Sequence, residues 1–216
     1  MIQVVLWDLD GTLVDSGPGI TESVAYALRH YGIVEENPAV LRQFVGPPLA
    51  DAFREKYGFD EETCRETIRY FQEYYRSRGI HHTTVYPGIR ETLAVLRKKN
   101  IRNWVATSKP EPFAIQVLKE QQLFSEFERI AGADIGEKHC QKSGIIRRLL
   151  SLENDFRPSE MRMVGDRCFD VIGAAENRLS TIGVLYGYGS RKELQKAGAE
   201  ILIETPEELP GVLASL

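Results

Sequence analysis

An apolar run that ends in two aspartates, close to the start of the chain, constrains the fold more than any other stretch. Four apolar residues in a row, Val4–Trp7, are typical of a strand that is buried on both faces, as in a parallel sheet. Asp8 and Asp10 follow, and the backbone of Gly11 can turn so that the two carboxylates approach each other. Two carboxylates so placed repel each other unless a cation or a proton lies between them. The spacing alone is equally compatible with a turn whose acids are simply solvated.

From Pro87 onward the chain alternates between helical and strand-like segments. The patterns predict helices at 89–99, 110–120, 142–152, 171–177 and 191–197, and a terminal turn at 207–209. They predict strands at 101–107, 128–131, 161–164, 181–185 and 200–203. Strands and helices that alternate through short loops imply right-handed crossovers. The predicted fold class is therefore α/β, with a doubly wound parallel sheet.

About sixty residues between the first strand and the next contain helical patterns and no strand pattern. Helices are predicted at 17–31, 38–44, 49–57 and 60–78. This length is far beyond an ordinary crossover between neighbouring strands. We therefore predict an inserted small α-helical cap domain over 16–81 and a core domain made of 1–15 and 82–216. Hinges are expected near Asp15–Gly17 and Ile80–Pro87.

The composition excludes several classes of protein. The 216 residues carry a net charge of −4, so no basic field for nucleic acid is present. No apolar run approaches the roughly 20 residues of a membrane span. The three cysteines form no CxxC pair, which disfavours a zinc site or a disulfide framework and suits a reducing compartment. We expect a cytoplasmic protein, a monomer or weak homodimer, with no nucleic-acid or membrane partner.

Polar side chains also follow two later predicted strands. Thr107 and Ser108 end one of them, and Asp166 ends another, with Asp170 one helical turn further on. The carboxyl ends of parallel strands lie at one edge of the sheet, so these groups can converge with Asp8. Several aspartates at one place require a cation, and an all-oxygen ligand set suits Mg²⁺. A hydroxyl together with the ammonium of Lys142 then points to phosphate as the bound oxyanion.

The stretch Asp8-Leu9-Asp10-Gly11-Thr12-Leu13-Val14-Asp15-Ser16 resembles the DxDGTLxDS opening of the haloacid dehalogenase-like phosphatases. Four motifs of that family occur in order over most of the chain, and the phosphoglycolate-phosphatase-like branch with a helical cap is the most similar. The resemblance implies that Asp8 attacks phosphorus and forms an aspartyl-phosphate. It implies that Asp10 protonates the leaving alcohol and then deprotonates the attacking water.

The resemblance also implies the remaining roles. Metal ligands would be Asp8, the backbone carbonyl of Asp10, and Asp166, with Asp170 as an alternate ligand or a residue that supports the others. Phosphate donors would be the Thr107 hydroxyl and the backbone at Leu9 and Ser108. Lys142 would offset the negative charge, although Lys109 and Lys138 compete for this role and Lys138 is the main alternative.

Substrate selection is predicted to involve the cap. Gly46 and Pro47 resemble the cap loop that faces the active site in this branch, although an ordinary helix connection is an equal alternative. Arg42 and Arg54 flank that loop and could meet an anionic substrate, whereas Phe71 and Tyr75 are interpreted as cap core. The expected activity is an Mg²⁺-dependent phosphatase for a small phosphorylated metabolite, first 2-phosphoglycolate. The alternatives are a 5'-nucleotidase acting on nucleoside monophosphates, a sugar phosphomutase, and a receiver domain that accepts phosphate without turnover.

Overall fold

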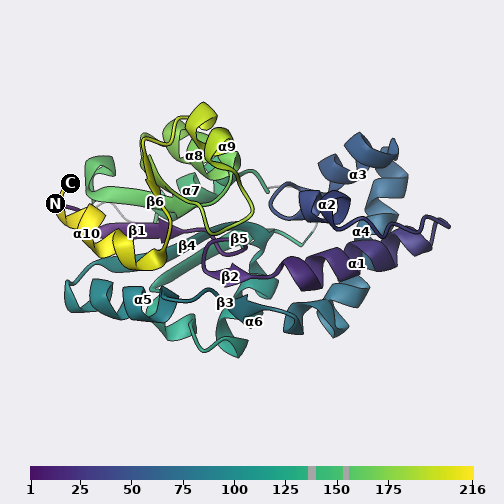
Figure 1. Cartoon of the computed structure of the whole chain (residues 1–216), viewed down its shortest axis with the longest axis horizontal. Helices are drawn as coiled ribbons and strands as arrows, with labels where there is room; N and C mark the ends of the chain where they lie inside the picture. Colours follow the sequence, from purple (N-terminus) through teal and green to yellow (C-terminus); the bar gives the residue numbers. More distant parts are fainter. Residues whose placement is uncertain (136–139, 153–155) are drawn as a thin grey trace.

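A six-stranded, entirely parallel sheet forms the centre of the computed structural model, which describes residues 1–135, 140–152 and 156–216 (Figure 1). The strand order is β5-β4-β1-β6-β7-β8. The strands are β1 (Val4–Trp7), β4 (Arg102–Pro110), β5 (Arg129–Ala133), β6 (Met161–Gly165), β7 (Ser180–Val184) and β8 (Ile201–Ile203). The predicted α/β fold with a doubly wound parallel sheet is confirmed.

Strand β1 lies where the direction of the strand order reverses. The chain first adds β4 and β5 on one side of β1, and then returns to add β6, β7 and β8 on the other side. Trp7 is level with Val105 of β4 and with Val164 of β6, so β1 and β6 end at nearly the same level while β4 continues to Pro110. Open α/β sheets bind their ligands in the crevice at such a reversal. The residues that follow β1 and β6 therefore occupy the expected ligand site.

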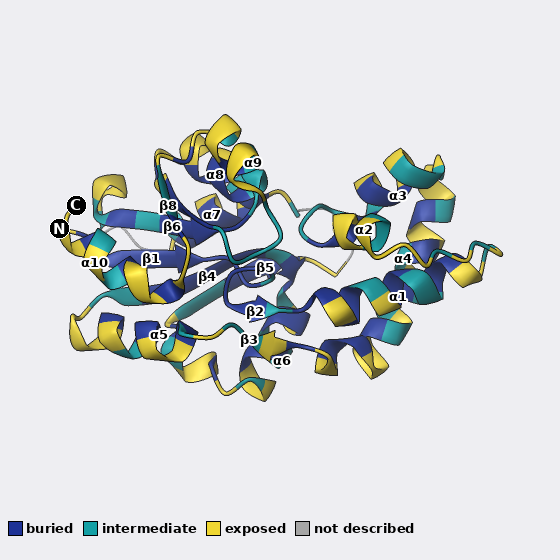
Figure 2. Ribbon diagram, viewed as in Figure 1, coloured by how far each residue is buried: buried dark blue, intermediate teal, exposed yellow. Residues whose placement is uncertain are grey.

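Helices cover both faces of the sheet (Figure 1). On one face lie α5 (Ile89–Lys98), α6 (Glu111–Glu120) and α10 (Leu209–Ala214); on the other lie α7 (Lys142–Leu150), α8 (Cys168–Glu176) and α9 (Arg191–Ala197). Val5 and Trp7 contribute to one apolar cluster, and Val4 and Leu6 to a second. Successive side chains of a strand point to opposite faces, so β1 is buried on both, as predicted (Figure 2).

The cap consists of four helices that lie beyond the carboxyl ends of the central strands (Figure 1). They are α1 (Gly17–Arg29), α2 (Pro38–Leu41), α3 (Leu49–Tyr57) and α4 (Glu61–Ser77). Local chemistry sets their ends: the Asp60 carboxylate accepts a hydrogen bond from the Thr63 amide at the start of α4, and Gly58 ends α3 in a left-handed conformation. The helices all fall within the predicted insertion, and we retain 16–81 as its proposed bounds.

Two short strands join the cap to the core, and the sequence patterns did not predict them. β2 (Val14–Asp15) pairs antiparallel with β3 (Thr84–Val85), so the outgoing and returning linkers bond to each other. Strands of two residues carry no alternation that a pattern could reveal. The remaining short elements are single 3₁₀ turns: η1 (Arg42–Phe44), η2 (Gly79–His81), η3 (Phe124–Glu126), η4 (Pro158–Glu160) and η5 (Pro206–Glu208).

Strand β4 extends to Pro110, whereas the sequence analysis ended it at Thr107. The pairing with β5 is regular up to Ala106 and shifts before Pro110. Such an irregularity changes the direction in which the side chains of a strand point. Residues 107–109 therefore belong to a strand end whose side chains face the ligand site.

Candidate active site

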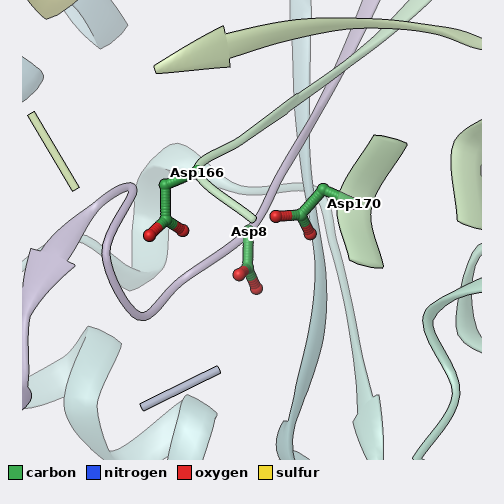
Figure 3. Close-up of side chains that lie close together, drawn as sticks. All are labelled: Asp8, Asp166 and Asp170. Atoms are coloured by element: carbon green, nitrogen blue, oxygen red, sulfur yellow. The ribbon is translucent and has the colours of Figure 1, made fainter. Parts of the chain in front are cut away.

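Three buried aspartates gather beyond the ends of β1 and β6. Asp8 follows β1, Asp166 follows β6, and Asp170 lies in the first turn of α8 (Figure 3). Each offers a carboxylate oxygen, and these oxygens all lie within 4.8 Å of one another. All three residues are at most 7% exposed. The convergence expected from the sequence is present for these three side chains.

Asp166 is held by neutral donors. Its Oδ1 accepts a hydrogen bond from the Thr12 hydroxyl at 3.3 Å, and its Oδ2 accepts one from the backbone amide of Tyr188 at 2.8 Å. Within the described part of the chain no cation forms an ion pair with it. Burial, reinforced by the charges of Asp170 and Asp8, raises the pKa of Asp166 to about 8.

Lys142 provides the positive charge of the cluster. Its Nζ lies 2.7 Å from Asp8 Oδ1 and 2.8 Å from Asp170 Oδ1, and it donates a hydrogen bond to the carbonyl of Ala106 at 2.9 Å. Burial alone lowers the pKa of Lys142, but the charges of Asp170 and Asp8 outweigh it and raise this pKa above its ordinary value. Lys142 is therefore a permanent cation beside Asp8. The alternative lysine, Lys138, lies outside the described residues.

The cluster has more negative charge than Lys142 can balance. The one ammonium contacts two of the three carboxylates, and burial followed by the charge of Asp170 raises the pKa of Asp8 to about 6 even though Lys142 opposes the shift. Apart from the ion pairs with Lys142, Asp8 Oδ1 and Asp170 Oδ1 have no hydrogen-bond partner. Hard oxygen donors with excess negative charge are the ligands that Mg²⁺ prefers. The residues present therefore fit a magnesium ion.

Asp10 lies apart from this cluster and has its own lysine. Lys109 Nζ is 2.9 Å from each carboxylate oxygen of Asp10, and the Ser16 hydroxyl donates to Asp10 Oδ1 at 2.6 Å. The Asp10 carboxylate is not one of the three clustered groups, so its predicted role through the backbone carbonyl remains a prediction. From the sequence, Lys109 is predicted only as a competitor of Lys142 for offsetting the negative charge. The irregular end of β4 is what directs it to Asp10 instead.

The predicted phosphate donors lie close to Asp8. Thr107 and Ser108 line the same cavity as Asp8, and the Thr107 hydroxyl accepts a hydrogen bond from the Lys109 amide at 3.2 Å. The side chain of Leu9 is fully buried in the core, and its carbonyl accepts hydrogen bonds from the turn that follows. Their roles as phosphate donors remain predictions.

Gly11 allows the turn after β1 to pass close to the acids. Its φ of +83° is favourable for glycine only, and a Cβ atom there would lie 2.4 Å from Asp166 Oδ2. The turn therefore requires glycine both for its conformation and for the close approach of the Asp166 side chain, which follows β6.

A small cavity of about 70 Å³ lies between the core and the cap. Its floor comes from the core: Asp8, Asp10, Thr107, Ser108, Lys109, Pro110 and Phe113. Its cap wall consists of Ile20, Phe44, Gly46, Pro47, Pro48, Leu49, Phe71, Gln72 and Tyr75. Both the edge of the sheet and the cap therefore contribute residues to the site.

The loop with Gly46 and Pro47 is fixed to the core by Arg167, which directly follows Asp166. The Arg167 guanidinium donates to the carbonyl of Val45 and pairs with Glu193 at 2.9 Å. A Cβ atom on Gly46 would lie 2.7 Å from the guanidinium, and Gly46 has a φ of +107°. This contact places the loop in the cap wall. The sequence was equally compatible with a loop that faces the site and with an ordinary helix connection.

Four other residues differ from their sequence interpretation. Phe71 and Tyr75 were interpreted as cap core, but both line the cavity as well as being buried. Arg54 and Arg42 were expected to meet an anionic substrate. Arg54 instead pairs with Asp51 at the surface, and Arg42 lines a separate cleft between the cap and the core. A helical pattern identifies an apolar face but cannot show whether it faces a core or a cavity.

Capped α/β enzymes that hydrolyse phosphoric monoesters are the class to which this fold and site point. The chain belongs to the haloacid dehalogenase-like hydrolases, because the model of that family matches residues 5–184. A 5'-nucleotidase of Pseudomonas aeruginosa is 39% identical over 88% of this chain and 86% of its own length. A phosphoglycolate phosphatase of Chromobacterium violaceum is 31% identical over 96% and 95%, respectively.

A solved structure agrees over the full length. The crystal structure of a predicted phosphatase from Clostridium acetobutylicum is 41% identical, with a TM-score of 0.95 over 100% of both chains. The chain is thus a phosphatase of this family. Among the described residues, no helix has the length and apolar character needed to cross a membrane.

Proposed function

We propose that the protein is an Mg²⁺-dependent phosphatase that hydrolyses a small phosphomonoester through an aspartyl-phosphate on Asp8. The observation that carries this proposal is the position of Asp8 among Lys142, Asp166 and Asp170 at the strand reversal. Asp8 is the one clustered aspartate that also lines the cavity, so it alone can meet a substrate.

In the first step an oxygen of Asp8 forms a bond to phosphorus while the bond between phosphorus and the leaving oxygen breaks. Asp10 gives its proton to that oxygen, so the product leaves as an alcohol. In the second step Asp10 takes a proton from water, which attacks phosphorus and releases Asp8 and phosphate. The Lys109 and Ser16 contacts support this role, because they fix the Asp10 carboxylate at the cavity floor.

Asp8, Asp166 and Asp170 would hold Mg²⁺, with the Asp10 carbonyl and waters as further ligands. When bound, the ion neutralises charge on the phosphoryl oxygens and on Asp8. Lys142 adds positive charge beside Asp8, where it also contacts Asp170. Thr107 and the backbone at Leu9 and Ser108 would donate hydrogen bonds to the phosphoryl group.

Two substrate classes are supported by relatives. The resemblance to phosphoglycolate phosphatases, with the relative from C. violaceum, favours 2-phosphoglycolate. The relative from P. aeruginosa, which is more similar, favours nucleoside monophosphates. A sugar phosphomutase remains an alternative because it uses the same four motifs, whereas family membership argues against a receiver domain without turnover.

Release of inorganic phosphate from a panel of phosphorylated metabolites tests this proposal. We expect repeated turnover with Mg²⁺, loss of turnover on addition of a chelator, and recovery when Mg²⁺ is restored in excess. Turnover that persists in the chelator would contradict the ligand set. Transfer of phosphate between positions of a sugar, without its release, would support the mutase alternative.

A further inference from the structure

The cap wall is mainly apolar and aromatic. Phe44, Phe71 and Tyr75 present rings to the cavity, and Phe113 adds a fourth from the floor. The Phe71 and Tyr75 rings are nearly parallel, with centroids 5.5 Å apart, and Phe113 meets Tyr75 at 64° with the same separation. Ring arrangements of this kind favour a flat apolar group that can stack or meet an edge.

The described residues that line the cavity offer no free positive charge to a leaving group. Among the described residues that line it, Lys109 is the one cation. Its ammonium already contacts both oxygens of Asp10 and lies 4.7 Å from the centre of the Tyr75 ring. A second anion would have to break this buried ion pair, and an unpaired buried carboxylate is strongly unfavourable.

Two other described cations near the site, Lys142 and Arg76, do not change this balance. Lys142 lies behind Asp8 and is shared between two carboxylates. Arg76 contacts the Phe113 ring from an exposed position of α4 and does not line the cavity. The neutral polar groups of the cap wall are the amide of Gln72 and the Tyr75 hydroxyl, which is buried without a hydrogen-bond partner. They can orient a neutral substituent but cannot neutralise a charge.

Resting on the proposed phosphatase function, we propose that the substrate is a phosphomonoester of an uncharged alcohol that carries a flat aromatic or heteroaromatic ring. The phosphoryl group binds at the floor beside Asp8, and the ring binds against Phe71, Tyr75 and Phe113. A carboxylated alcohol such as glycolate is disfavoured, because its charge would be buried without a partner. Of the two classes above, this wall suits a nucleoside better than glycolate.

Two matched pairs of primary alkyl phosphates test charge and ring separately. Phosphoglycolamide and 2-phosphoglycolate have the same shape and differ in charge, whereas benzyl and ethyl phosphate differ in the ring. We expect kcat/KM to be at least about tenfold higher for phosphoglycolamide than for 2-phosphoglycolate, and for benzyl than for ethyl phosphate. If 2-phosphoglycolate matches its amide, or ethyl phosphate matches benzyl phosphate, the proposal is wrong. If the metabolite panel releases phosphate with Mg²⁺ but none of these four does, the ring proposal is wrong; if the panel also fails, the proposed phosphatase function itself fails.

Variants of the cap wall test whether its residues cause the preference for uncharged alcohols that carry a ring. Gln72→Lys places a cation in the half-buried cap wall, and we expect it to raise the ratio of kcat/KM for 2-phosphoglycolate over its amide by about tenfold. Gln72→Met is the matched control, because it also removes the hydrogen bond from Gln72 to the Ile135 carbonyl and adds no charge. Phe71→Leu should reduce kcat/KM several-fold more for benzyl phosphate than for ethyl phosphate. Phe59→Leu, a half-buried cap aromatic outside the cavity, should change neither; an unchanged benzyl preference in Phe71→Leu would overturn the assignment.

Discussion

The floor and the cap wall of one cavity follow different physical rules. The floor holds buried charges, and most of them have a specific partner: Lys142 for Asp8 and Asp170, and Lys109 for Asp10. The cap wall has rings, prolines and one amide, and it carries no charge. The difference supports the proposal that the sheet edge determines the reaction, whereas the inserted helices determine which alcohol can leave. Substitutions in the floor should therefore affect turnover of every substrate, whereas substitutions in the cap wall should affect the preference among substrates.

The largest effect is expected at the floor, from Asp8→Asn. Loss of the nucleophile should reduce kcat by on the order of 10³-fold or more for every substrate, because no other described aspartate of the cluster faces the cavity. Phosphate release measures this loss, and a circular dichroism melt checks that the fold is intact. Substantial turnover in this variant would remove Asp8 from its assigned role.

Replacing Lys142 should have the next largest effect. Lys142→Met leaves Asp8 and Asp170 without their cation, so we expect kcat to fall by about 10²–10³-fold. The free energy of unfolding, measured with urea, should fall by about 3–5 kcal/mol. Lys142→Arg keeps the charge and serves as the control for folding. A loss of stability with unchanged kcat would mean that Lys142 is structural only.

A smaller effect is expected at the second lysine. Lys109→Met should lower kcat by about tenfold, because the Asp10 carboxylate loses two of its three contacts but keeps Ser16. The loss should be similar for charged and neutral substrates if Lys109 serves Asp10. Selective loss of turnover of 2-phosphoglycolate would instead show that Lys109 binds the leaving group, and would weaken the distinction between floor and wall.

The last effect concerns stability and its dependence on pH, and it involves no change in turnover. In the absence of metal, the pKa of Asp166 is raised to about 8 from an ordinary value of 3.8, so the folded state binds more protons than the unfolded state between these values. Stability of the metal-free protein should therefore fall as the pH rises from about 4 to about 8.

Thermal melts with and without Mg²⁺ measure this dependence. Mg²⁺ should raise Tm more at pH 8 than at pH 6, with about 2–4 °C expected for each kcal/mol. Asp166→Asn should flatten the pH dependence of the metal-free protein and reduce the response to Mg²⁺. A larger Mg²⁺ response at pH 6 than at pH 8 would contradict this account.

The floor was largely predictable from the sequence, because its acids directly follow buried strands. Periodicity located the strands, and the parallel sheet placed Asp8 and Asp166 together. Lys109 was missed because its contact with Asp10 depends on a local irregularity of β4 that no residue pattern signals. The paired linkers β2 and β3 were missed because each has only two residues.

The cap wall was less predictable for a different reason. The helices at 49–57 and 60–78 were located correctly, since capping and spacing are local properties. What an apolar helix face contacts is a tertiary property, so Phe71 and Tyr75 could not be distinguished from core residues. Arg42 and Arg54 show the converse error, because nearness in sequence to the loop did not bring them to the cavity.

The pairing of β2 with β3 has a consequence for how such a molecule can be altered. Both ends of the inserted helices leave the sheet through one narrow bonded stem, Val14–Asp15 beside Thr84–Val85. A foreign insert whose ends lie equally close together could be grafted onto the same stem while the strands beneath keep their register. The stem therefore marks the cap, proposed as residues 16–81, as the part in which we expect selectivity to be rebuilt without touching the reacting groups.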